Sequence, residues 1–242
     1  MTTRYKTKAF VFRKNNINES DRVFSVFTDC FGRLDIFAKA IRKSTSKLKS
    51  GIDIFFMSEI EFIQGKNRKT LTDASTIEKF DNVCQDQEKF ETANRISEVL
   101  NDFIKGEEKD NEVFELLTDF FNKLDNGSLK IKNHRLAFQY FFWNFISLQG
   151  YRLQVDNCAI CTSKLNPYNI YFSNKEGGVV CKKCSVTDKS LKRINSDIVK
   201  ILRLIFRKDW RTISKLKIEP SSQQLLEEVS ENAIHVFCPV HC

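Results

Sequence analysis

Two Cys-x-x-C pairs constrain this chain more than any other feature of its 242 residues. Cys158 and Cys161 form the first pair, Cys181 and Cys184 form the second, and nineteen residues separate the two pairs. Each pair places two sulfurs on one tight turn, and two facing turns supply the four corners of a tetrahedron around Zn²⁺. Because four thiolates leave no coordination position for a reactive water, the pattern favours one structural zinc ion.

The segment between the pairs is rich in turn residues and predicts a short hairpin, too small to bury a core, that a metal ion would hold together. Three alternatives stay open: a pair of disulfides, a redox dithiol and unconnected cysteines. A thioredoxin-like dithiol follows a strand and opens a helix, whereas the first pair here follows a predicted helix. Near the end of the chain, Cys238, His241 and Cys242 can hold a second metal ion, with His235 as a further ligand.

Hydrophobic periodicity divides the chain. Strand-like alternation occurs at 6–12, 22–28, 33–38, 52–63 and 70–74, and five short strands predict a small barrel, either an OB-fold or an SH3-like barrel. Helical stripes follow at 93–104 and 113–124, and the segment 132–148 is apolar on nearly every face, as expected of a buried central helix. Further helices are predicted after Ser196, at 210–216 and after Ser222, with the two serines as caps.

The sequence therefore predicts an α+β protein with two domains. Residues 1–80 form a small barrel or sandwich, and residues 81–242 form a helical domain into which a zinc finger is inserted at 155–188. No apolar run is long enough to cross a membrane, and cysteines at knuckle spacing without a secretory signal indicate the reducing cytoplasm.

The formal net charge of +8 is unevenly distributed. Residues 1–80 carry sixteen Lys/Arg against nine Asp/Glu, residues 81–150 carry eight against thirteen, and residues 151–242 carry fifteen against nine. Two basic blocks thus flank an acidic one. A polyanionic partner fits this pattern, and nucleic acid is favoured over a membrane surface because no basic amphipathic terminal helix is visible. The alternative is a solvated basic surface.

The first basic block contains a loop with four cations, Arg42, Lys43, Lys47 and Lys49, beside three hydroxyl residues and Leu48. Flexible cations and hydroxyls suit phosphate contacts, and exposed aromatics on neighbouring strands can stack bases. The alternative is a solvated hairpin loop. The second block either binds a polyanion or offsets the charge of a zinc–thiolate centre; its members are Lys182, Lys183, Lys189, Lys192, Arg193, Lys200, Arg203, Arg207, Lys208 and Arg211.

No enzymatic motif is present: there is no glycine-rich phosphate loop, no metalloprotease or esterase motif, and no zinc-deaminase pattern. We therefore expect a non-enzymatic protein. Three functions compete: DNA binding and annealing, a zinc-stapled protein-interaction hub without direct DNA binding, and a thiol oxidoreductase that uses one Cys pair.

Several motifs together resemble the RecO family of bacterial recombination mediators over the whole chain. They are Glu19-Ser-Asp-Arg22, Phe27-Thr28 with Gly32, Ala38-Lys-Ala-Ile-Arg-Lys43 with Ser46-Lys-Leu48, and the four cysteines placed after a helix. The chain departs from the family pattern at Ala40, where Gly is common, at Thr45, where Pro is frequent, and in its Cys-Pro-Val-His-Cys ending.

The resemblance implies that residues 1–80 are an OB-fold nucleic-acid-binding domain and not an SH3-like barrel, followed by a helical domain with a zinc finger in many members. It also implies binding of single- and double-stranded DNA, annealing of strands coated by single-strand-binding protein, action with RecR in loading RecA, and a cytoplasmic, nucleoid-associated location. The acidic C-terminal tail of single-strand-binding protein would bind the helical domain. By position, Arg42, Lys43, Lys47 and Lys49 fall in the family's basic segment, with Arg22, Arg33 and Lys39 as further candidates.

Overall fold

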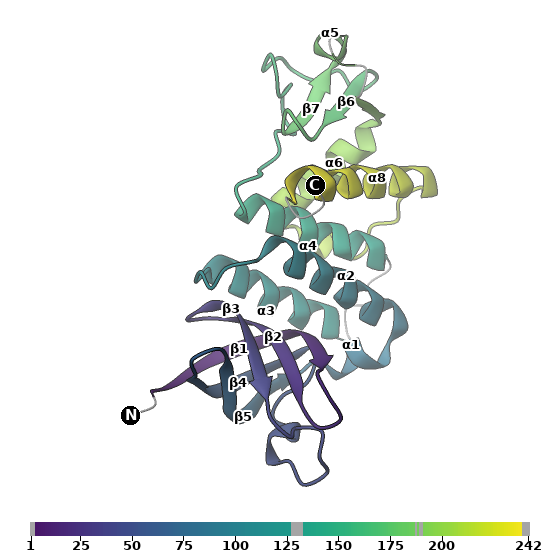
Figure 1. Cartoon of the computed structure of the whole chain (residues 1–242). Helices are drawn as coiled ribbons and strands as arrows, with labels where there is room; N and C mark the ends of the chain where they lie inside the picture. Colours follow the sequence, from purple (N-terminus) through teal and green to yellow (C-terminus); the bar gives the residue numbers. More distant parts are fainter. Residues whose placement is uncertain (1–2, 127–132, 187, 189–190, 239–242) are drawn as a thin grey trace. The chain divides into compact units, whose positions relative to one another are not determined.

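The computed structural model describes residues 3–126, 133–186, 188 and 191–238, which fall into two compact units, 1–127 and 128–242. The first unit holds a barrel and three helices, and the second holds a helical group with a small sheet (Figure 1). This division places the helices at 81–125 in the same unit as the barrel. The domain boundary at residue 80 stays a prediction from sequence.

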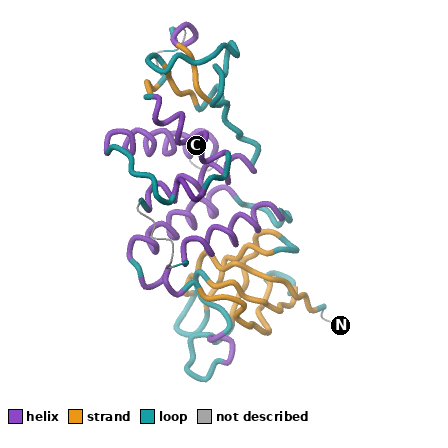
Figure 2. The backbone as a smooth tube through the Cα atoms, turned by 180° about the vertical axis from the view of Figure 1, so that it is seen from behind, coloured by secondary structure: helices purple, strands orange, loops and turns teal. Residues whose placement is uncertain are grey.

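Five strands form the barrel, and they are β1 (Arg4–Asn16), β2 (Arg22–Thr28), β3 (Gly32–Ala38), β4 (Phe56–Gln64) and β5 (Lys69–Lys79). The closed order is β1-β2-β3-β5-β4, with β1 pairing antiparallel to both β2 and β4 and with β3 parallel to β5 (Figure 2). This order is OB-like and confirms the predicted α+β class.

Alternating side chains fill the barrel, as the period-2 pattern predicts. Phe24 and Val26 of β2 and Leu34 and Ile36 of β3 point into one buried cluster. The strand predicted at 52–63 begins four residues late, because Ile52 enters that cluster from the preceding loop and Phe55 has a left-handed φ of +57°.

Helices α1 (Asp81–Gln85), α2 (Gln87–Phe103) and α3 (Asn111–Asp125) complete the first unit. Asp86 and Asp110 cap α2 and α3 by accepting backbone N–H groups of the first turn. The outer face of β1 packs on this helical layer, since the Phe10 ring lies 4.4 Å from that of Phe121 and 6.2 Å from that of Phe80.

The second unit contains α4 (His134–Leu148), β6 (Ile170–Ser173), β7 (Gly178–Cys181), α5 (Lys182–Ser185), β8 (Lys192–Ile194), α6 (Ser196–Phe206), α7 (Trp210–Ile213) and α8 (Pro220–Phe237). Every residue of α4 from Leu136 to Ile146 is buried, which confirms the predicted all-round burial. The finger sheet, in the order β7-β6-β8, is inserted between α4 and α6. Among the described helices, none has the length and hydropathy that crossing a bilayer requires.

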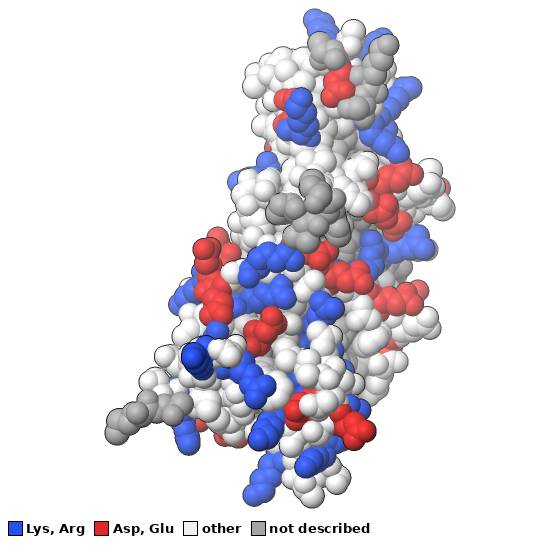
Figure 3. Space-filling model, in the orientation of Figure 1, with Lys and Arg blue, Asp and Glu red and all other residues white. Residues whose placement is uncertain are grey.

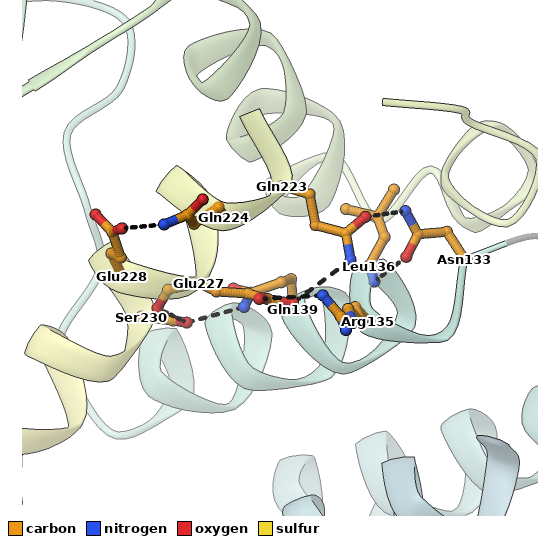
Figure 4. A network of polar contacts seen from close by, with 9 residues as sticks. All are labelled: Asn133, Arg135, Leu136, Gln139, Gln223, Gln224, Glu227, Glu228 and Ser230. Carbon is orange, nitrogen blue, oxygen red and sulfur yellow. Dashed lines mark hydrogen bonds and ion pairs between the residues drawn. The ribbon is translucent and has the colours of Figure 1, made fainter. Parts of the chain in front are cut away.

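Polar contacts hold α8 on α4 (Figure 4). The buried Gln139 amide donates to Ser230 Oγ at 2.8 Å, and Asn133, which caps α4, donates to Gln223 at 2.9 Å. Both predicted serine caps are wrong. Asn195 caps α6 instead, because its side chain accepts two backbone N–H groups, and α8 begins at Pro220, two residues before Ser222.

Candidate functional site

The four cysteines form one cluster. Their sulfurs all lie within 4.8 Å of one another, and those of Cys161 and Cys181 are 3.8 Å apart. Zinc–sulfur bonds of about 2.3 Å give a tetrahedron with edges of about 3.8 Å. A disulfide would need about 2.05 Å. The geometry therefore fits a bound metal ion, compatible with zinc, and the described cysteines are free of disulfides.

The local fold brings the two pairs together. Cys158 lies beside β7 because the next residue, Ala159, donates its N–H to Val179 O at 2.8 Å. The Cys181 N–H points at Cys158 Sγ across 3.4 Å. Gly178 lets the backbone of Gln154 lie against the start of β7, since a Cβ on Gly178 would lie 2.2 Å from Gln154 O. Backbone pairing, more than side-chain burial, positions the sulfurs.

The ionisation of each thiol depends on its neighbours in the cluster. The Ser163 hydroxyl, 3.1 Å from Cys161 Sγ, lowers the pKa of that thiol to about 6, whereas contact with Cys161 raises the pKa of Cys184 to about 12. Four thiolates so close together repel one another, which opposes the ionisation of all four. A divalent cation at their centre offsets this repulsion. The cluster has the donor set of a closed, structural metal site.

The second site is one end of the barrel, which we call the basic rim. Asn16 pairs with Arg22, and Arg22 pairs with Ala38, so the loops 17–21 and 39–55 leave the barrel at this end. The rim comprises Arg22, Lys39, Arg42, Lys43, Lys47 and Lys49. In Figure 3, Lys and Arg side chains lie among white and red residues on the segment that extends below the barrel in Figure 1.

The rim loops are anchored to one another. The Arg42 guanidinium donates to Asn18 O at 2.7 Å, and its backbone N–H donates to Ser20 O at 3.0 Å. Further along, Lys14 binds Asp53 at 2.6 Å, and Leu48 packs against the barrel core. Lys43, Lys47 and Lys49 are exposed between these anchors. The loop thus presents cations on a fixed base, which differs from a freely solvated hairpin.

Arg33 lies at the opposite end of the barrel from the rim. Its guanidinium donates to Asn101 O at 2.9 Å and to Ile104 O at 2.6 Å, and it lies over the Phe12 ring. These carbonyls end helix α2, so Arg33 caps that helix. Arg22 stays at the rim, where its Nε donates to Asn16 at 3.0 Å.

Two further barrel cations, Lys66 and Arg68, are absent from the sequence-based set. The Arg68 guanidinium lies 3.8 Å from the centroid of the Phe37 ring. The run Gly65-Lys-Asn-Arg-Lys69 signals only a turn until the parallel β3–β5 pairing places it beside β3, at the end of the barrel opposite the rim. The expectation of exposed aromatics on neighbouring strands is wrong for β2 and β3, because Phe24, Phe27 and Phe37 are all buried.

In the second basic block, at least four described members are engaged within the unit. Lys200 pairs with Asp197, and Arg193 donates to Tyr168 O. Arg203 donates to Val155 O at 2.9 Å, and Lys192 forms an ion pair with Glu228. Cys238 is buried, whereas Lys189, His241 and Cys242, which belong to the predicted block and second metal site, lie outside the described residues.

The chain combines an OB-like barrel, which has a cationic rim, with a helical unit that carries four clustered cysteines. OB-type barrels are a fold that commonly binds oligonucleotides, and these features define a class of OB-fold proteins. The family description "Recombination protein O N terminal" matches residues 1–80, and "Recombination protein O C terminal" matches residues 84–236. The chain belongs to the RecO family of DNA repair proteins.

Curated relatives agree with this assignment. A DNA repair protein RecO of Dehalococcoides mccartyi is 32% identical over 225 residues, which cover 93% of this chain and 86% of the relative. The protein of the same name from Caldanaerobacter subterraneus is 28% identical over 88% of this chain and 84% of the relative. The protein of the same name from Alkaliphilus metalliredigens is 26% identical over 96% of this chain and 92% of the relative.

Proposed function

We propose that this protein is a non-enzymatic recombination mediator that binds and anneals single-stranded DNA through the basic rim. The observation that carries the proposal is the anchored loop: hydrogen bonds to Asn18 and Ser20 fix its start, and Lys43, Lys47 and Lys49 are left exposed. Fixed cations of this kind bind phosphates without reading sequence. Family membership supports the same function.

Within this function, the protein helps to load RecA, with RecR, onto strands coated by single-strand-binding protein, whose acidic tail binds the helical unit. It also binds duplex DNA and acts in the cytoplasm at the nucleoid. The support is family resemblance together with the two basic blocks. These partners are expected to bind the protein without any covalent chemistry.

We further propose that the four cysteines hold one structural Zn²⁺. Their sulfur spacing supports a metal ion, and the closed donor set leaves no position for catalysis. The ion would hold together a finger whose strands have only three or four residues each.

The test of the central proposal is binding and annealing of fluorescent oligonucleotides at several salt concentrations. A protein that neutralises several phosphates loses orders of magnitude in affinity between about 50 and 200 mM salt. A protein-interaction hub without direct DNA binding would show neither measurable affinity at low salt nor acceleration of annealing.

A further inference from the structure

Tyr168 is the most exposed large apolar or aromatic side chain among the described residues, with 80% of its surface accessible. It belongs to the zinc finger, in the turn that precedes β6. The barrel strands β2 and β3 bury all their aromatics, so they offer no flat ring to a base. A single exposed tyrosine is common on protein surfaces, and its neighbours decide whether it has a role.

Strand pairing gathers cations around this ring. Ile170 of β6 pairs with Cys181 of β7, so the residues just before β6 lie beside those just after β7. Tyr168 therefore shares one end of the sheet with Lys182 and Lys183. The Arg193 guanidinium of β8 also reaches this end, because it donates to Tyr168 O at 3.4 Å.

One face of the finger sheet is directed away from the helices. Tyr171 pairs directly with Arg193, and paired residues share a face. Their strand neighbours Phe172 and Lys192 lie on the other face, where Phe172 contacts the Trp143 ring at 6.2 Å and Lys192 pairs with Glu228. Since those contacts belong to α4 and α8, the Tyr171–Arg193 face is the outer one.

The finger carries more positive charge than a metal site requires. From residue 155, where the finger begins, to residue 194, where β8 ends, the chain carries seven Lys/Arg and three Asp/Glu, a difference of +4. A zinc ion with four thiolates has a formal charge of roughly −2, so cations exceed what that centre would offset. Among the described residues, no ion pair involves the side chains of Lys182, Lys183 or Arg193.

We propose that Tyr168, Tyr171, Lys182, Lys183 and Arg193, the finger surface, form a second contact for single-stranded DNA. Tyr168 stacks on an unpaired base while the cations bind the flanking phosphates. An exposed ring beside cations favours a single strand, because duplex bases are already stacked and an acidic peptide would use the cations alone. This inference rests on the proposed DNA-binding function and adds a base contact that strands β2 and β3 lack.

The first test compares Tyr168→Ala with Tyr168→Phe by fluorescence anisotropy on an oligothymidine. The alanine variant should bind about five- to tenfold more weakly, and the phenylalanine variant should bind like the natural protein because the ring remains. Lys175→Ala is a matched control, since Lys175 lies in the turn between β6 and β7, at the other end of the hairpin. Metal content should stay unchanged in all three variants.

The second test uses Tyr168→Trp as a stacking probe. The natural Trp143 and Trp210 are buried, so fluorescence quenching by oligothymidine reports on position 168. We expect strong quenching by the single strand, and little by a duplex or an acidic peptide.

The two proposals fail in different ways. If Tyr168→Ala binds normally and Tyr168→Trp is not quenched while the rim variants lose affinity, the finger surface is not a DNA contact and the proposed function stands. Quenching by the acidic peptide alone would make the finger surface a protein contact. A natural protein that binds no DNA at low salt would overturn both proposals.

Discussion

The Asp21 carboxylate accepts a hydrogen bond of 2.7 Å from the backbone N–H of Ala40, a residue held at a left-handed φ of +54°. The contact joins the β1–β2 loop to the first residues of the basic loop. A left-handed conformation costs an L-residue with a side chain about 1–2 kcal/mol. Asp21 therefore fixes strained backbone at the point where the cationic segment begins.

Ala40→Gly should stabilise the protein slightly. Relief of the left-handed strain returns about 1–2 kcal/mol, and the greater freedom of glycine in the unfolded chain removes about 0.5–1 kcal/mol, so a net gain of about 0.5–1 kcal/mol is expected. Urea unfolding measures the difference. Ala93→Gly, in the regular helix α2, is the control and should destabilise. Equal losses in both variants would mean that Ala40 is not strained.

Asp21→Ala should lower the free energy of unfolding in a pH-dependent way. The Ala40 N–H, followed by the Asn18 amide, lowers the pKa of Asp21 below its ordinary value of 3.8. A lowered folded-state pKa contributes stability that is complete above the ordinary value and is lost as pH falls through the folded value. The difference in the free energy of unfolding between the natural protein and the variant should become smaller below about pH 4. A difference that does not change with pH would show that the charge of Asp21 is unimportant.

Gly32→Ala should destabilise the first unit more than backbone strain alone explains. Gly32 has a φ of +66°, and a Cβ there would lie 2.0 Å from Glu108 O, which is main chain and cannot move aside cheaply. We expect a loss of about 3 kcal/mol or more. Gly177 has the same φ of +66° with nothing near a Cβ, so Gly177→Ala should cost only about 1–2 kcal/mol. Similar losses would exclude the clash.

Local pattern in the sequence predicted the barrel, the three long apolar helical segments and the cysteine cluster. Alternation predicted the strands that carry Val26 and Ile36, which lie in the core, and the spacing of two Cys pairs predicted which sulfurs meet. These features depend on residues close in sequence. The end of the barrel at which each cation lies depends on strand pairing, so Arg33 entered the predicted set although it lies at the end opposite the rim.

Helix starts and short strands were also harder to predict, because they too depend on contacts that form only in the folded chain. Asn195 and Ser196 are both good caps, and only the folded backbone selects Asn195. The three-residue strand β8 exists because β6 offers it an edge, and its sequence has no alternating pattern. Most Phe residues of the barrel segment are predicted to be core, and any exposed ones could stack bases; Phe27 and Phe37, which lie outside the central cluster of the barrel, are also buried.

Cys161→Ser should release the metal and destabilise the finger without removing any catalytic activity. A closed four-thiolate site contributes its binding free energy to folding, so the melting temperature should fall along with the zinc content. Cys84→Ser is the control, since Cys84 is exposed and lies outside the cluster. Elemental analysis and thermal melting check both variants. Loss of metal with unchanged melting would contradict a structural role, and absence of metal from the natural protein would favour a redox dithiol.

The most direct test of the basic rim is the salt dependence of single-strand binding by a variant in which Arg42, Lys43, Lys47 and Lys49 are all alanine. Each lost phosphate contact should flatten the slope of log affinity against log salt by about 0.7, equally for unrelated sequences. Arg33→Ala, which removes a helix cap at the other end of the barrel, should lower stability and leave the slope unchanged. An unchanged slope in the fourfold variant would contradict the account and move the DNA site away from the rim.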